Sequence, residues 1–239
     1  MRFFRSIERP LAFTFDLDDT LYDNGPIIRR ATQTLSDFLD QQHPDIAQLS
    51  KKHWRSLRRN AIASDPRLAS DMSRLRQTIL TELAVMAGYT AERATDVADQ
   101  GYRLFYQARS DFSVDKNIYS CLKALSEHRP IVAITNGNVD LDAVGIGSLF
   151  SAIFQANIHA PMKPSPAMFN TALEVLDLPA NRVLHVGDHL IKDVWAARNV
   201  GMRTAWYACN RRMDMNSEPI RLLPDLALST LDDLLRFID

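Results

Sequence analysis

The sequence lacks long apolar runs, has few cysteines and carries almost no net charge. No segment approaches the ~20 apolar residues that a membrane-spanning helix requires, and no signal-peptide-like apolar region precedes Asp16. The two cysteines, Cys121 and Cys209, form neither a disulfide framework nor a metal-ligand pattern with nearby histidines. A formal net charge of −1 gives no sign of nucleic-acid binding. We therefore expect a cytoplasmic protein that binds neither membranes nor nucleic acid.

The most informative stretch is residues 11–21, where an apolar segment stops at Asp16, Asp18 and Asp19. The apolar part predicts a strand buried on both faces. Asp16 then lies at the carboxyl end of the strand, where α/β sheets usually carry their sites. Like charges repel, so a buried strand that ends in a carboxylate cluster needs a reason to keep it. The reasons we consider are a bound cation, a nucleophilic carboxylate, or both.

The next segment is helical throughout. Residues 23–111 contain four stretches of helical periodicity with no strand between them, which predicts a small bundle with its own core. Beyond residue 111, helical stretches alternate with strand candidates at 130–135, 152–155, 182–186 and 203–207.

This alternation predicts an α/β fold with a mostly parallel sheet. The first strand must join that sheet. We therefore predict an α/β core of residues 1–22 and 112–239 with a helical bundle, residues 23–111, inserted after the first strand. A length of 239 residues, 46% of them hydrophobic, suffices for both parts.

Three later segments carry polar residues of the kind that the first cluster needs. A strand ends in Thr135-Asn136-Gly137, whose hydroxyl and backbone N–H groups suit a phosphate oxygen, although such a sequence usually makes only a turn. Lys163 precedes a proline-initiated helix, and a lone loop lysine is usually just solvated. Gly187-Asp188 follows another strand, and Asp193 stands at the head of a helix, where an N-cap is the commoner explanation.

Together, these pieces resemble the haloacid dehalogenase-like hydrolase superfamily. Its motifs correspond in order to Asp16-Leu17-Asp18-Asp19-Thr20, Thr135, Lys163, and Gly187-Asp188 followed by Asp193. The resemblance covers residues 10–22 and about 112–210. It implies a Rossmann-like core under an α-helical cap.

The resemblance also assigns roles. It implies that Asp16 is a nucleophile that forms an aspartyl-phosphate and that Asp18 carries protons. Mg²⁺ is then held by Asp16, Asp188 and the backbone carbonyl of Asp18, with Asp193 at its edge. The residues expected at the phosphoryl group are Thr20, Thr135, Asn136, Gly137 and Lys163.

Asp18 separates phosphatases from the dehalogenases of the same family. A halide leaving group needs no proton, and the family's dehalogenases resemble a version of the first motif that lacks this second aspartate. We therefore expect a phosphatase for a small phosphate monoester. A sugar-phosphate or nucleotide phosphatase, a phosphomutase, a 2-haloacid dehalogenase and a non-catalytic phospho-ligand binding module remain alternatives.

The sequences around the first two motifs look like the bacterial branch of the family that acts on flavin mononucleotide (FMN) and the phosphorylated pyrimidine precursor of riboflavin.

Part of the predicted cap is strongly basic: residues 51–76 contain eight Lys or Arg against two Asp, a net charge of +6. Such a run is usually a solvated face, but it can also steer an anionic substrate. Arg74 and Arg76 are the candidates to reach the substrate. A monomer and a homodimer are both compatible with the sequence.

Overall fold

The computed structural model describes residues 1–238 and contains one seven-stranded sheet. The strands are β1 (Arg2–Phe3), β2 (Ala12–Phe15), β3 (Ile131–Thr135), β4 (Ala152–Gln155), β5 (Val183–Gly187), β6 (Arg203–Trp206) and β7 (Leu226–Ala227). Their order in the sheet is β1-β7-β6-β5-β2-β3-β4, and every neighbouring pair is parallel except β1 with β7. The predicted mostly parallel α/β sheet is confirmed. The edge strands β1 and β7, each of two residues, were not expected.

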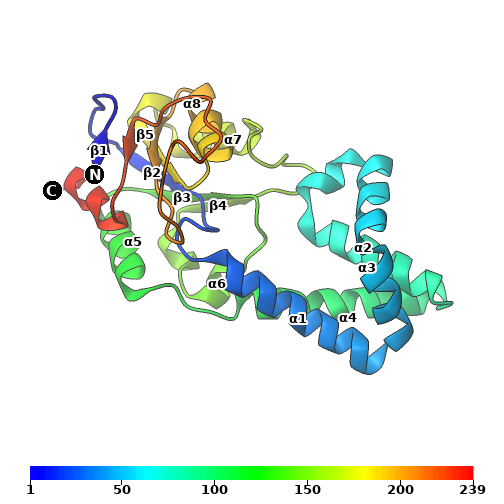
Figure 1. Cartoon of the computed structure of the whole chain (residues 1–239). Helices are drawn as coiled ribbons and strands as arrows, with labels where there is room; N and C mark the ends of the chain where they lie inside the picture. Colours follow the sequence, from blue (N-terminus) through cyan, green and yellow to red (C-terminus); the bar gives the residue numbers. More distant parts are fainter. Residues whose placement is uncertain (239) are drawn as a thin grey trace.

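Helices cover both faces of the sheet (Figure 1). The α-helices of this part are α5 (Lys116–His128), α6 (Leu141–Val144), α7 (Ala167–Leu176) and α8 (Ala196–Asn199). One face of the sheet buries Phe15 in a cluster with Leu122 of α5, and the other buries Val132 with Phe169 of α7. All four residues of β2 are fully buried, and each Phe there contributes about 2 kcal/mol through burial. This burial is consistent with the position of β2 inside the sheet, between β5 and β3.

Short helical turns fill the remaining connections. They are the 3-10 turns η1 (Pro66–Ser70), η2 (Gly147–Leu149), η3 (Ala180–Arg182) and η5 (Leu231–Phe237), and the π-helical turn η4 (Leu190–Trp195). The helix that Asp193 was expected to begin is thus a π turn that contains Asp193, followed by α8, and the N-cap of the π turn is His189. A π turn is commonly found at functional sites.

The helical cap lies to one side of the sheet (Figure 1). It consists of α1 (Asn24–Gln42), α2 (Pro44–Ser64), α3 (Met72–Met86) and α4 (Ala91–Ser110). Asp23, Asp71 and Thr90 cap α1, α3 and α4 by accepting backbone N–H groups. The apolar faces of the four helices form a separate hydrophobic cluster. The predicted helical bundle is therefore present with a core of its own.

The two segments that connect the cap to the rest of the chain lie next to each other. The rings of Tyr22 and Phe112, which flank the cap in sequence, lie 4.6 Å apart between centroids. The guanidinium of Arg30 in α1 donates to the carbonyls of Ala108 and Asp111, so α1 is tied to the end of α4. Within residues 1–238, no helix has the length and apolar character needed to cross a membrane.

Candidate active site

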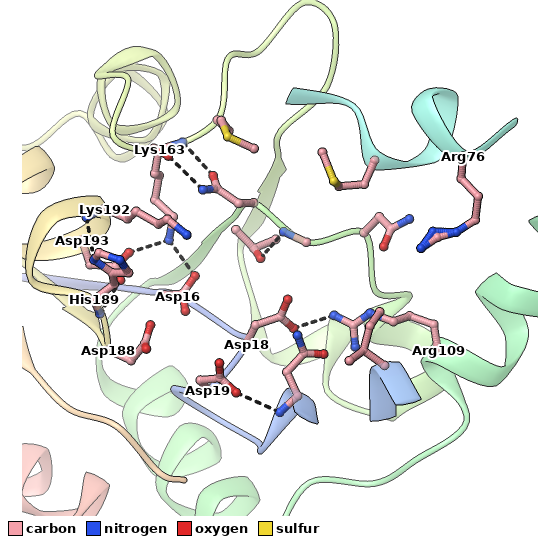
Figure 2. Close-up of a pocket in the computed structure, with 18 of the residues that line it drawn as sticks. Asp16, Asp18, Asp19, Arg76, Arg109, Lys163, Asp188, His189, Lys192 and Asp193 are labelled. Carbon is pink, nitrogen blue, oxygen red and sulfur yellow. Dashed lines mark hydrogen bonds and ion pairs between the residues drawn. The ribbon is translucent and has the colours of Figure 1, made fainter. Parts of the chain in front are cut away.

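The carboxyl ends of β2, β3 and β5 lie at one edge of the sheet because these neighbouring strands are parallel. Asp16 follows β2, Thr135 ends β3 and Asp188 follows β5. Asp193 of η4 and Lys163 of the loop before α7 reach the same edge (Figure 2). The structure therefore brings together the five residues that four distant parts of the sequence supply.

A cavity of about 370 Å³ lies between this edge and the cap. The cap lines it with Ile28, Met72, Arg76, Phe105 and Arg109. The core lines it with the strand-end residues described above. A ligand in this cavity therefore touches both parts of the chain.

Lys163 is the buried centre of the site. Its ammonium group donates to Asp16 Oδ1 at 2.6 Å, to Asp193 Oδ1 at 2.6 Å and to the carbonyl of Ile134 at 2.7 Å. Burial alone would lower the pKa of Lys163, but the attraction of the two carboxylates outweighs it and raises the pKa above its usual value. All three of its N–H donors are occupied, so Lys163 is a fixed positive charge.

The carboxylates around this lysine carry an excess of negative charge. Burial and the neighbouring acids raise the pKa of Asp16 to about 8 despite Lys163, and burial together with Asp193 raises that of Asp188 to about 6. Burial would also raise the pKa of Asp193, but Lys163 and His185 outweigh it and lower the value. One ammonium group thus does not neutralise the cluster.

The cluster has the donor set of a hard divalent cation. Carboxylate oxygens of Asp16, Asp188 and Asp193 lie within 4.8 Å of one another. Oxygen ligands of this kind suit Mg²⁺, and a bound cation would relieve the repulsion that raises the pKa of Asp16 and Asp188. The residues present therefore fit a magnesium ion.

Asp193 is held by a network of its own. His185 Nε2 lies 3.3 Å from Asp193 Oδ1, and His185 Nδ1 lies 2.8 Å from the hydroxyl of Thr14. Burial lowers the pKa of His185, so the ring is neutral. A carboxylate only accepts, so Nε2 carries the proton and Nδ1 accepts from Thr14. A Cβ on Gly187 would lie 2.4 Å from Asp193 Cγ, which explains the glycine before Asp188.

Asp18 faces away from this cluster and towards the cap (Figure 2). Its Oδ1 accepts from Arg109 Nη2 at 2.5 Å and from the hydroxyl of Tyr22 at 2.8 Å. A Cβ on Gly137 would lie 2.7 Å from Asp18 Oδ2, so the turn after β3 approaches this side chain closely. The carboxylate of Asp18 is thus separated from those of the metal cluster.

The other residues expected at the phosphoryl group have distinct positions. Thr20 is fully buried and donates to Asp16 Oδ2 at 3.0 Å, so it orients Asp16 and does not line the cavity. The Thr135 hydroxyl accepts from the N–H of Gly137 at 2.9 Å, which leaves its proton free to donate. Asn136 lines the cavity, but its amide forms two hydrogen bonds with the backbone of Lys163. Asn136 therefore positions Lys163.

The two arginines proposed to reach the substrate lie in different places. Arg76 lines the cavity, whereas Arg74 is exposed and lines a separate hollow on the cap with Asp65 and Asp99. None of the other basic residues between 51 and 76 lines the cavity.

Sequence reasoning missed two further arginines. Arg109 is almost fully buried beside Asp18, and Arg211 donates to Asp188 Oδ2 at 2.8 Å and to Glu218 Oε1 at 3.0 Å. Arg109 lies in the last turn of a helix, where basic residues are common. No local pattern in the sequence marks Arg211. Asp19, which had no expected role, accepts from the N–H of Asn24 at 3.0 Å and so fastens the start of α1.

Comparison with known proteins places this site in a family. The sequence pattern of the haloacid dehalogenase-like hydrolases matches residues 11–201, which include every strand-end residue of the site. The chain belongs to this family. The expected HAD-like hydrolase is therefore confirmed, and so is its Rossmann-like core with a helical cap.

Two relatives cover nearly the whole HAD-like chain. The 5-amino-6-(5-phospho-D-ribitylamino)uracil phosphatase YigB of Escherichia coli K12 is 35% identical over 238 residues, with full coverage of both chains. The structure of a 2-haloacid dehalogenase from Pseudomonas syringae pv. Tomato DC3000 is 31% identical, has a TM-score of 0.86, and covers 95% of this chain and 97% of its own.

A more distant structure shares the fold. The HAD hydrolase YfnB of Bacillus subtilis, solved with bound magnesium, is 20% identical with a TM-score of 0.62 over 97% of this chain and 100% of its own.

Proposed function

We propose that this HAD-like hydrolase is a Mg²⁺-dependent phosphatase that cleaves a small phosphate monoester through an aspartyl-phosphate on Asp16. The observation that carries the proposal is the geometry of one cavity: Asp16 paired with Lys163 at 2.6 Å on one side, and Asp18 turned to the cap on the other. The full-length similarity to a phosphatase supports it.

The chain's own residues account for both halves of the reaction. A carboxylate oxygen of Asp16 attacks phosphorus while the bond from phosphorus to the substrate's alcohol oxygen breaks. Asp18 gives a proton to that oxygen, and the alcohol leaves. Asp18 then takes a proton from water, whose oxygen attacks phosphorus and releases inorganic phosphate and Asp16. Lys163 and Thr135 stabilise the transferring phosphoryl group.

Magnesium would be held by the carboxylates of Asp16 and Asp188 and the backbone carbonyl of Asp18, with Asp193 at its edge. When bound, the ion supplies positive charge between the anionic nucleophile and the anionic phosphate. The ammonium group of Lys163, which is ion-paired with Asp16, supplies a second positive charge beside this carboxylate.

For the substrate we propose FMN or 5-amino-6-(5-phosphoribitylamino)uracil, the phosphorylated riboflavin precursor. Support comes from the similarity to a phosphatase of that precursor over the whole chain. We further propose that residues 23–111 act as the cap that selects this substrate over the catalytic core of residues 1–22 and 112–239. The cap residues that line the cavity support this division.

A second candidate is dehalogenation, favoured by the similarity to the Pseudomonas syringae dehalogenase. Asp18 argues against it. A halide leaves without a proton, so a dehalogenase has no use for a carboxylate that is fixed by Arg109 and Tyr22 at the cavity.

The decisive experiment measures phosphate release from FMN and from the riboflavin precursor, with Mg²⁺ and with EDTA. We expect Mg²⁺-dependent release that disappears in Asp16→Asn, while Asp177→Asn, a change outside the site, retains it. Release that survives Asp16→Asn would contradict the covalent mechanism. Chloride release from 2-haloacids would favour the dehalogenase. Ligand binding without turnover across a broad phosphate panel would indicate a binding module.

A further inference from the structure

Arg76 is a half-buried cation with no hydrogen-bonding or ion-pair partner among residues 1–238. It projects from α3, and its guanidinium carbon lies 3.4 Å from the centroid of the Phe105 ring and 6.0 Å from that of Trp54. Its side chain makes no hydrogen bond or ion pair with any residue from 1 to 238, and its Nε is buried and unpaired. Stacking on Phe105 stabilises the charge but satisfies none of its N–H donors.

This arrangement is costly for the protein alone. Burial, with a contribution from nearby Arg109, lowers the pKa of Arg76 to about 10, so the group is still charged at neutral pH. Buried donors without acceptors destabilise a fold, and a charged group does so more strongly. The two other arginines at this site, Arg109 and Arg211, each pair with an aspartate, although Arg109 Nη1 is also buried and unpaired within residues 1–238. A ligand that brings acceptors to Arg76 would remove this cost.

The position of Arg76 indicates which part of a ligand it meets. Figure 2 shows Arg76 across the cavity from Lys163, the residue that marks the phosphoryl end. Beyond Arg76 and Phe105, which line both spaces, a second hollow of about 250 Å³ opens between α1 and α2. A substrate whose phosphate lies near Lys163 would therefore have its opposite end next to Arg76.

The surroundings of Arg76 define the chemistry of that end. Ile28, Met72 and Phe105 provide apolar walls. Residues that line the cavity carry three buried polar atoms without a partner among residues 1–238: the donors Arg76 Nε and Arg109 Nη1, and the acceptor Asn24 Oδ1. A second phosphate or carboxylate would also pair with Arg76, but its charge would lie against these apolar walls. A flat ring with carbonyl oxygens gives acceptors to Arg76 without a net charge and packs against the apolar walls.

We propose that Arg76 is a specificity-determining residue that donates to the carbonyl oxygens of a planar ring at the far end of the phosphate monoester. The proposal rests on the phosphatase function proposed above. It predicts that Arg76 discriminates between phosphate esters with and without such a ring, whereas the strand-end residues treat all of them alike.

The test compares kcat/KM for FMN with kcat/KM for ribitol 5-phosphate, which has the same phosphorylated chain but no ring. In Arg76→Met we expect the ratio of the two values to fall about 30-fold, the loss of one charge-assisted hydrogen bond, mainly through the KM for FMN. Arg76→Lys keeps the charge without the planar fork and should recover only part of the ratio. Arg74→Met, two residues away on the exposed side, should leave the ratio unchanged.

Three results would overturn the proposal: an unchanged ratio in Arg76→Met, an equal loss for both substrates, or a larger loss for a bisphosphate such as fructose 1,6-bisphosphate. Binding provides a test independent of turnover. FMN fluorescence should show weaker binding to Asp16→Asn/Arg76→Met than to Asp16→Asn, and equal binding would refute the role of Arg76. If wild type hydrolyses no phosphate ester, the proposed function fails, and this binding comparison still tests Arg76.

Discussion

Arg109 of the cap donates a hydrogen bond to Asp18 of the core at 2.5 Å, although 91 positions separate them in the sequence. The arginine is 2% exposed, so the ion pair is largely shielded from water on its side. Because Asp18 is the proposed proton carrier, the cap reaches the chemical step directly through this contact. The two arginines of the cap that line the cavity thus have separate proposed roles: Arg109 positions the proton carrier Asp18, and Arg76 recognises the far end of the substrate.

Replacing Arg109 should impair catalysis more than substrate binding. In Arg109→Met we expect kcat to fall about 10- to 100-fold for every phosphate ester, since a hydrogen bond to a charged group is lost and Asp18 is no longer held. Steady-state kinetics should show a smaller change in KM. Arg103→Met, an exposed position on the same helix, serves as the control. A change in KM alone would instead assign Arg109 to substrate binding.

Gly137 should tolerate no side chain. A Cβ would lie 2.7 Å from Asp18 Oδ2 and 3.3 Å from Thr135 Oγ1, so Gly137→Ala should displace Asp18 and reduce kcat about 100-fold. We expect the melting temperature to change little, because the contact is with movable side-chain ends. Gly25→Ala, where the nearest atom is 3.1 Å away, is the matched control. Full activity in Gly137→Ala would show that the position of Asp18 is not critical.

Arg211 donates a hydrogen bond to Asp188, a proposed metal ligand. The positive charge of Arg211 at Asp188 Oδ2 therefore competes with Mg²⁺ for this carboxylate, and the ion pair is partly exposed. In Arg211→Met we expect the Mg²⁺ concentration for half-maximal thermal stabilisation to fall about fivefold, the worth of a modest ion pair. Arg212→Met, which is exposed, should leave it unchanged. A higher Mg²⁺ requirement would mean that Arg211 holds Asp188 in place for the metal.

Magnesium should stabilise the protein more at higher pH. The pKa of Asp16 is raised to about 8 and that of Asp188 to about 6, above the value of 3.8 that both have when unfolded. Without metal, the folded state therefore binds more protons than the unfolded state, and the contribution of these two groups to stability falls as pH rises from about 4 to about 8. Mg²⁺ binds their ionised forms, so it restores more stability where the protons are absent.

Melting curves with and without Mg²⁺ at pH 6 and pH 8.5 measure this effect. The increase in melting temperature should be larger at pH 8.5, and Asp188→Asn should abolish it at both values. Equal increases at the two pH values would show that the metal does not compete with protons at Asp16.

The strand-end residues were predictable from sequence for a topological reason. Parallel strands place their carboxyl ends together, so apolar runs that stop at Asp16, Thr135 and Asp188 indicate a common edge without knowledge of the strand order. The edge strands β1 and β7 were not predictable, because two residues carry no periodicity.

The cap residues were not predictable for a related reason. Residues two apart on a helix point about 200° from each other, so Arg74 and Arg76 face opposite sides. The sequence does not show which side faces the core. Arg109 and Arg211 acquire their partners only when segments distant in sequence meet. Helical periodicity finds apolar faces, and it contains no information on which charged residue will be buried.

The contact between Tyr22 and Phe112 has an evolutionary consequence. These rings, 4.6 Å apart, bracket a stretch of about ninety residues whose two ends are adjacent in space. Lengthening a loop whose ends already meet costs little conformational entropy, since the cost rises only with the logarithm of loop length. A lineage could therefore replace the whole insertion without disturbing the strand edge. New substrates would then arise by exchanging one module, while the phosphate chemistry is inherited unchanged.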